Sequence, residues 1–132
     1  MTLFFRIIYS AVVLFLVVTL LSPTSLIAQK KKRGSEDSSH GLRLREAEFY
    51  FTEGEKFFIL EDYAKALLYY QRAMEINPEN ATVHYKIAEV LSRSNKQDDL
   101  IKAAESIENA IRLYKTNKYF YLLAAGIYNG LA

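Results

Sequence analysis

The sequence predicts an all-α protein: an antiparallel helix-hairpin solenoid of about two and a half repeats, preceded by a signal or transmembrane helix and a disordered linker. Two observations predict this class. Apolar residues recur at intervals of three and four over most of the chain after Leu42, which is the period of amphipathic helices. Gly54 and Ala88 lie 34 residues apart in similar settings of bulky and small residues. Such a period is typical of stacked repeats, each of which buries its apolar face against its neighbours.

The start of the chain has the composition of an export signal. Arg6 is followed by an uncharged apolar run, and Pro23 and several small residues come after that run. This order predicts that residues 1–28 are a signal peptide, cleaved after the last of them. The alternative is an uncleaved membrane anchor over residues 7–27, because about 20 apolar residues are enough to cross a bilayer. The basic run that follows would then favour a C-terminal side in the cytoplasm.

Residues 29–41 predict a disordered basic and polar linker, because they offer no apolar side chain for burial. From Leu42 onward, basic and acidic residues are nearly equal in number. Nucleic acid is therefore not an expected partner, since phosphate binding needs a concentrated basic face. The chain has no cysteine, which excludes disulfides, cysteine-ligated metals and a thiol nucleophile.

Residues 42–132 predict one domain of five helices. Asp62 follows the first helix and suits the N-cap of the second, while Pro78 cannot continue a helix and so ends the second. A polar stretch at 94–99 separates the third helix from the fourth. The predicted helices cover about residues 43–60, 63–76, 81–94, 100–114 and 118–132.

This order of residues resembles the tetratricopeptide repeat family. The family pattern runs from an aromatic residue through a Leu-Gly pair, a tyrosine and small residues to a closing proline. The first repeat, residues 47–80, departs from it only at Glu53, where leucine is usual. Small residues allow the two helices of a hairpin to approach closely, and large residues fill the space beside them. The matching residues are Tyr50, Gly54, Phe57, Ala66, Tyr70, Ala73 and Pro78.

A second repeat, residues 81–117, and a partial third, residues 118–132, follow the pattern more loosely. Ala66 and Ala103 are 37 residues apart, so three extra residues are expected in the polar turn, and Lys115 replaces the closing proline. The packing residues predicted here are His84, Ile87, Ala88, Leu91, Ala103, Ile107 and Ala110, followed in the third repeat by Tyr121, Ala124, Ala125 and Tyr128.

The resemblance implies a protein or peptide partner held in a concave groove, which the first helix of each repeat lines. Relatives that bind acidic chaperone tails carry lysine and asparagine where this chain has Phe51 and Glu55, so that function is not expected. Phe51 and Phe58 either line the groove or pack on a neighbouring helix. The residues that face the groove by the family pattern are Phe51, Glu55, Phe58, Ile59, Tyr85, Lys86, Glu89 and Arg93.

The sequence predicts neither an enzyme nor a cofactor or metal site. His40 and His84 stand apart from each other, and His84 occupies a packing position. No zinc-binding helix motif, glycine-rich phosphate loop or serine elbow is present.

The expected function is a non-catalytic interaction or scaffold module of the bacterial cell envelope, exported or periplasmic. The alternative is the N-terminal adaptor of a longer protein whose functional domain lies beyond Ala132, and a retained anchor would instead give a cytoplasm-facing scaffold. Tyr119–Ala132 carries no charge, which predicts either that the chain is the front part of a longer repeat array or that this helix is covered by a partner, such as a second copy of the chain. Membrane contact is expected only through an uncleaved N-terminal segment.

Overall fold

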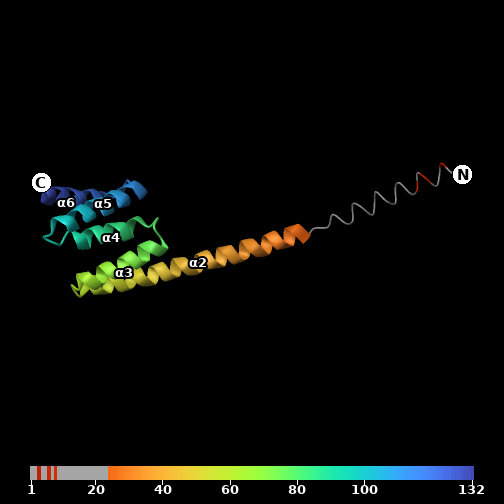
Figure 1. Ribbon diagram of the computed structural model, residues 1–132, viewed down its shortest axis with the longest axis horizontal. Helices are drawn as coiled ribbons and strands as arrows, with labels where there is room; N and C mark the ends of the chain where they lie inside the picture. The colour runs from red at the N-terminus through yellow and green to blue at the C-terminus, as the bar shows by residue number, and fades with distance from the viewer. Residues whose placement is uncertain (1–2, 4–5, 7, 9–23) are drawn as a thin grey trace. The chain divides into compact units, whose positions relative to one another are not determined.

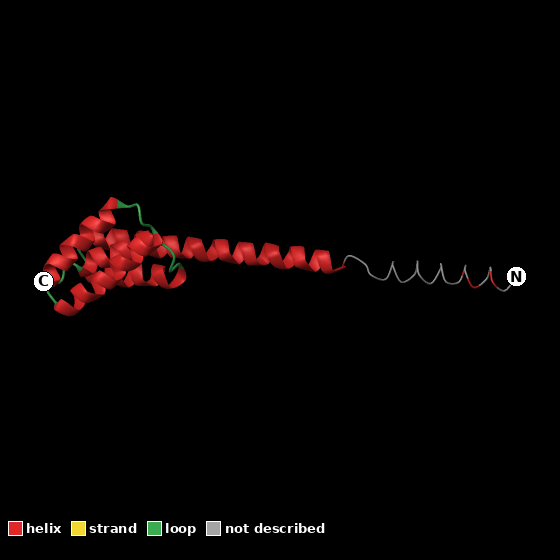
Figure 2. Cartoon of the chain, turned by 90° about the horizontal axis from the view of Figure 1, so that it is seen from above, coloured by secondary structure: helices red, strands yellow, loops and turns green. Residues whose placement is uncertain are grey.

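Five α-helices make up the part of the chain that the structure describes. The computed structural model describes residues 3, 6, 8 and 24–132, and among these it has no strand (Figure 2). Residues 1–39 and 40–132 form two separate units. In the second unit the helices pack in chain order, each against the next (Figure 1). The helices are α2 (Thr24–Ile59), α3 (Tyr63–Ile76), α4 (Ala81–Leu91), α5 (Gln97–Leu113) and α6 (Lys118–Leu131).

Helix α2 corrects one prediction. It covers residues 29–41, where the sequence analysis expects a disordered linker. A lack of apolar side chains removes a reason for packing but does not prevent a helix, because the glutamine, lysine, arginine and glutamate residues of this segment have good helix propensity. Pro23 lies just before the first residue of α2, and no other proline occurs before Pro78. A helix nucleated in the packed part of the chain can therefore extend toward the N-terminus, since propagation costs less than nucleation.

The predicted signal peptide, residues 1–28, and the alternative anchor, residues 7–27, lie mostly outside the described residues. Among the residues that are described, none of the helices combines the length and apolarity needed to span a bilayer.

The turn between α2 and α3 is built from local hydrogen bonds. The backbone N–H of Asp62 donates to Phe57 O at 3.0 Å, and that of Glu61 donates to Phe58 O at 3.1 Å. This pair of bonds is a Schellman motif, and Glu61 takes the left-handed conformation it requires, with φ of 60°. Asp62 then caps α3, as predicted, by accepting from the backbone N–H of Lys65 at 3.2 Å.

Two asparagines start the later hairpins in the same way. Asn80 accepts from the N–H of Thr82, and Asn117 accepts from the N–H of Tyr119, each at 3.0 Å. Each side chain thus satisfies one free donor at the start of its helix. Helices α4 and α6 begin directly after these caps, as the turn residues predict.

The three extra residues of the second repeat lengthen a helix more than a turn. Helix α5 has 17 residues, whereas its counterpart α3 has 14, and α5 begins at Gln97 inside the predicted polar turn. Asp98 and Asp99 lie in the first turn of α5, where negative charge is favoured by the helix dipole. A prediction from polarity alone therefore starts this helix three residues too late.

The core follows the alternation of small and large residues. A methyl group built on Gly54 would lie 2.6 Å from two ring atoms of Tyr70, so only glycine allows this approach of α2 to α3. Ile107 is also fully buried, which contributes about 1.5–3 kcal/mol. Tyr50 and Phe57 are half-buried, and Pro78 is exposed in its turn. The predicted packing residues that the structure buries are Gly54, Ala66, Tyr70, Ala73, His84, Ile87, Ala88, Leu91, Ala103, Ile107, Ala110 and Ala124.

Helix α6 departs from the packing prediction on one side. Phe120, Ala124 and Ile127 are buried, but Ala125 is exposed and Tyr128 is 45% exposed. Helix α6 packs against α5, and no later helix of the described chain covers its other side. The repeat register is thus kept in α6, while the contact that would bury Ala125 and Tyr128 is absent.

Candidate functional site

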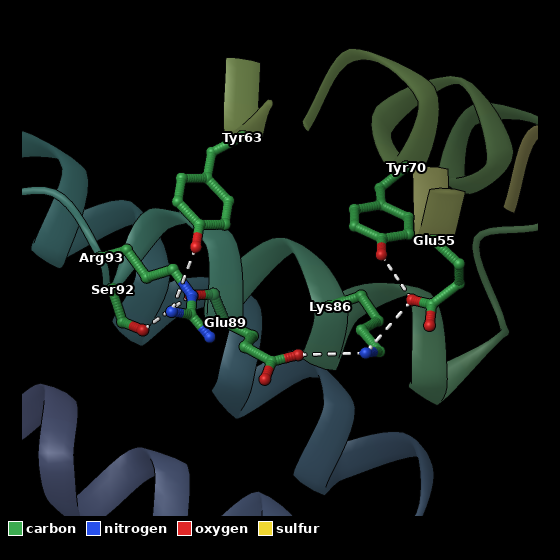
Figure 3. Close-up of polar contacts among 7 residues, drawn as sticks. All are labelled: Glu55, Tyr63, Tyr70, Lys86, Glu89, Ser92 and Arg93. Atoms are coloured by element: carbon green, nitrogen blue, oxygen red, sulfur yellow. Dashed lines mark hydrogen bonds and ion pairs between the residues drawn. The ribbon is translucent and has the colours of Figure 1, made fainter. Parts of the chain in front are cut away.

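Of the eight residues predicted to face the groove, seven lie on α2 and α4, the first helices of their hairpins, and Arg93 lies in the turn that follows α4. The structure brings five of them into one cluster that also includes Tyr63 and Tyr70 of α3, and Figure 3 shows the polar contacts of this cluster. Ile59 lies apart at the end of α2, where it is 77% exposed. The clustered groove residues are Glu55, Phe58, Lys86, Glu89 and Arg93.

Lys86 is the centre of the polar part of the cluster. Its Nζ lies 3.1 Å from Oε1 of Glu55 and 3.2 Å from Oε2 of Glu89 (Figure 3). The hydroxyl of Tyr70 donates to the same Oε1 of Glu55. The bonds connect α2, α3 and α4, so this network joins the first hairpin to the second.

The surroundings of Lys86 and Tyr70 raise the pKa values of both groups. Burial by itself would lower the pKa of Lys86, but the hydrogen bond to Glu55 and the charge of Glu89 outweigh it and raise that pKa. Burial, followed by the bond to Glu55, raises the pKa of the Tyr70 hydroxyl. At neutral pH Tyr70 is therefore protonated and Lys86 carries its positive charge.

Glu89 is incompletely satisfied. Its Oε2 is buried and pairs electrostatically with Lys86, yet no hydrogen bond of good geometry reaches this atom. A buried carboxylate oxygen in this state retains capacity for a further donor. The polar cluster thus has an excess of one negative charge over Lys86 and one acceptor atom without a directed bond.

Aromatic rings form the apolar part of the cluster. The ring of Phe58 lies between two cations, with Lys86 Nζ at 4.8 Å and the Arg93 guanidinium at 5.0 Å from its centroid. Arg93 also lies 5.1 Å from the centroid of the Tyr63 ring and donates to its hydroxyl at 3.4 Å. Within the part of the chain that the structure describes, Arg93 forms no ion pair with a carboxylate, so its charged group is contacted by aromatic rings.

The remaining two groove residues pack on rings as well. Phe51 lies 5.7 Å from the ring of Tyr70, and Tyr85 stacks on Phe120 of α6 at 5.2 Å. Phe51 and Tyr85 are half-buried and pack against the core. Phe51 therefore packs on a neighbouring helix, which is one of the two alternatives for it, and its place in a partner groove stays a prediction.

Sequence reasoning missed Tyr63 and Phe120 as parts of this surface. Tyr63 contacts Arg93, and Phe120 contacts Tyr85. In each pair the two residues lie at least 30 positions apart in the sequence. The repeat register could have predicted Phe120, because Phe120 follows the buried Val83 by 37 residues and the same spacing relates Ala66 to Ala103.

The described residues contain no group of three metal-ligating side chains. His84 is buried, and its Nε2–H donates to Pro78 O at 2.7 Å, so this ring serves to fix the turn before α4. Asp99 accepts from Ser94 Oγ and Glu108 accepts from the hydroxyl of Tyr128, so both carboxylates have structural partners. The chemistry that this surface offers is recognition by charge, hydrogen bonds and aromatic contact.

A family model for the TPR (tetratricopeptide) repeat matches residues 54–95. The matched segment runs from the C-terminal end of α2 past the end of α4 and contains the whole cluster around Lys86. This match supports the TPR family for that segment. A comparison with curated proteins gives no match.

Proposed function

We propose that the chain is a non-catalytic interaction module of the bacterial cell envelope, which holds a segment of another protein in the groove lined by α2 and α4. TPR repeats generally mediate protein–protein interaction, and residues 54–95 match this repeat. The observation that carries the proposal is the cluster around Lys86, where charged groups and aromatic rings of three helices meet at a partly exposed surface. Such a mixed surface suits a peptide better than a small apolar ligand.

The charges suggest how a segment would lie. The pair Glu55 and Glu89 leaves an excess negative charge beside Lys86, while Arg93 adds a positive charge in the turn that follows α4. A bound segment that carries both a basic and an acidic side chain would match both charges.

A matched pair of arginines tests the groove assignment. Arg93 and Arg72 are both exposed and both lie over tyrosine rings, but Arg72 pairs with Glu75 on the second helix of its hairpin. A photo-crosslinking residue at Ile59, on the groove rim, is expected to capture a partner that the same residue at position 72 does not. With the captured segment as ligand, Arg93→Ala is expected to weaken binding about tenfold, because an interfacial charge contact contributes about 1–2 kcal/mol. Arg72→Ala should leave binding unchanged, and equal losses in the two variants would refute the groove.

The envelope location rests on the composition of residues 1–28 and has its own test. Determination of the N-terminal residue of the mature protein is expected to give Gln29, as cleavage after Ala28 requires. A mature protein that retains residues 7–27 in the membrane fraction would establish the anchor in place of the cleaved signal.

A further inference from the structure

One side of α2 carries a stripe of side chains at the spacing of a coiled-coil seam. The stripe residues follow one another at alternating intervals of four and three, so they share one helix face over about 27 Å. Its three apolar members are 58–65% exposed. Leu60 directly follows α2 and keeps the helical spacing, because its N–H donates to Lys56 O at 3.1 Å. This outer stripe consists of Leu42, Glu46, Phe49, Glu53, Lys56 and Leu60.

The polarity of the outer stripe differs from that of the same side of α4. Phe49, Glu53 and Lys56 lie 34 residues before Val83, Ile87 and Val90 of α4. All three α4 residues are apolar and at most 5% exposed, whereas two of the three α2 residues are charged. An apolar helix packed on α2 here would remove these charges from water with no charge opposite them. The occupant that fits this side therefore carries charged residues of its own beside apolar ones.

The outer stripe is complementary to itself when two copies of α2 lie antiparallel. The order of intervals, four, three, four, three and four, reads the same in both directions, so reversal of one helix maps the stripe onto itself. A shift by seven residues either way leaves two of the six positions without a counterpart. In the unshifted arrangement the facing pairs are Leu42 with Leu60, Glu46 with Lys56, and Phe49 with Glu53.

The charges of the stripe favour this antiparallel direction. Among the described residues Glu46 forms no ion pair, and Lys56 pairs at 3.0 Å with Glu53 of its own helix. An ammonium has three donors, so Lys56 can also bind Glu46 of a second copy. Two parallel copies would instead place each charge opposite its like. Exposed ion pairs add little affinity, so the apolar pairs supply the attraction and the charges set the direction.

We propose that the chain forms a homodimer through the outer stripe, with the two copies of α2 antiparallel about a two-fold axis beside position 51. Such an interface is isologous, because both copies contribute the same surface. The groove residues Phe51 and Glu55 lie on another face of α2, where they contact Tyr70. The dimer therefore leaves both grooves open.

Single cysteines test the contact directly, since the chain has none of its own. Thr52 is exposed and flanks the stripe beside the axis, so its two copies lie close together in the dimer. Thr52→Cys in the full chain, expressed in bacterial cells and treated with a short bismaleimide, is expected to give a covalent dimer on a denaturing gel. Thr82→Cys, at an exposed threonine of α4, is the matched control and should stay monomeric. No cross-linking of Thr52→Cys, or equal cross-linking of both variants, would overturn the proposal.

A charge swap tests the pairing and its direction. Sedimentation of the full chain, as the cell processes it, is expected to show a concentration-dependent dimer. Glu46→Lys should weaken it at least tenfold, and Lys56→Glu added to that variant should restore it, because opposite charges again face each other. Glu48→Lys makes the same charge change on another face of α2 and should have no effect.

Phe49→Asp removes an apolar contact of the stripe at an exposed position and is expected to dissociate the dimer. Leu68→Asp is its control, at a leucine of α3 that is 63% exposed, and should leave the dimer intact. A chain that is monomeric at every concentration, or a dimer that Phe49→Asp and Glu46→Lys both leave intact, would refute the interface. A double variant no tighter than Glu46→Lys would refute the antiparallel pairing.

Discussion

At the scale of single residues, one small side chain in the first helix of each hairpin sets how closely the second helix approaches. Gly54 and Tyr70 form one such combination, and the register-equivalent Ala88 and Ile107 form the other. The sum of the two volumes is roughly conserved, since a smaller residue on one helix accompanies a larger one on its partner. Interiors are packed as densely as organic crystals, so a change of one methyl group at these positions has consequences.

Gly54→Ala is expected to destabilise the fold. The added methyl group would lie 2.6 Å from the ring of Tyr70, which is fully buried and cannot move aside. Overpacking of this kind costs about 1–3 kcal/mol, and it outweighs the gain of about 1 kcal/mol in helix propensity. Urea unfolding followed by circular dichroism measures the difference. The control is Gly126→Ala, which meets no atom within 4 Å and should stabilise by up to about 1 kcal/mol. Equal effects of both substitutions would show that Tyr70 does not limit position 54.

Several core residues could be predicted from the sequence because small and large residues alternate at helical spacing around them. Ala103 and Ile107 are examples, and both are fully buried. Contacts between separate helices could not be predicted in this way. The stacking of Tyr85 on Phe120 depends on how far apart α4 and α6 lie, and local periodicity contains no information on that distance.

At the scale of helices, the ends that have capping residues could be predicted and those without them could not. Asp62, Asn80 and Asn117 each accept a backbone hydrogen bond at the start of a helix. Helix α5 starts after Lys96, whose side chain makes no capping bond, so its boundary gave no sequence signal. The start of α2 was missed for a related reason, because disorder was inferred from polarity although the residues there have adequate helix propensity.

Glu61→Gly is expected to stabilise the protein by about 0.5–1 kcal/mol. Glu61 ends α2 with φ of 60°, a conformation that costs a residue with a Cβ about 1–2 kcal/mol. Glycine removes that cost but loses more entropy on folding, about 0.5–1 kcal/mol, so the net gain is smaller. Chemical denaturation at neutral pH measures the change in the free energy of unfolding. The matched substitution Glu79→Gly, in the exposed turn before α4, lacks a positive φ and should not stabilise; a gain of similar size there would contradict this explanation.

At the scale of the whole array, the outer sides of the first and last repeats differ in polarity. Positions that α4 and α6 bury against the preceding hairpin, such as Ile87 and Ala124, correspond to Glu53 in α2. Glu53 forms an ion pair with Lys56 at 3.0 Å, and the Lys56 side chain is 57% exposed. The departure of Glu53 from the leucine of the family pattern thus places charge on a side of α2 against which no hairpin of the described chain packs. The exposed side of α6 has no such charge.

The network from Tyr70 through Glu55 to Lys86 joins the two hairpins. Loss of protons from Tyr70 and Lys86 at alkaline pH is therefore expected to lower the stability of the array. The folded state raises the pKa values of Tyr70 and Lys86 above their ordinary values of 10.0 and 10.5. Above about pH 10 the unfolded chain therefore releases protons that the folded chain retains, so stability falls as pH rises, by at most about 1.4 kcal/mol per pH unit for each such group.

Tyr70→Phe removes one of these groups together with its bond to Glu55. It is expected to cost about 1–2 kcal/mol at pH 7, and this difference from the wild type should shrink progressively above pH 10. Urea unfolding at a series of pH values measures it, with Tyr114→Phe, at an exposed tyrosine, as the control that should match the wild type throughout. A deficit of Tyr70→Phe that stayed constant up to pH 11 would show that the proton of Tyr70 is not coupled to folding.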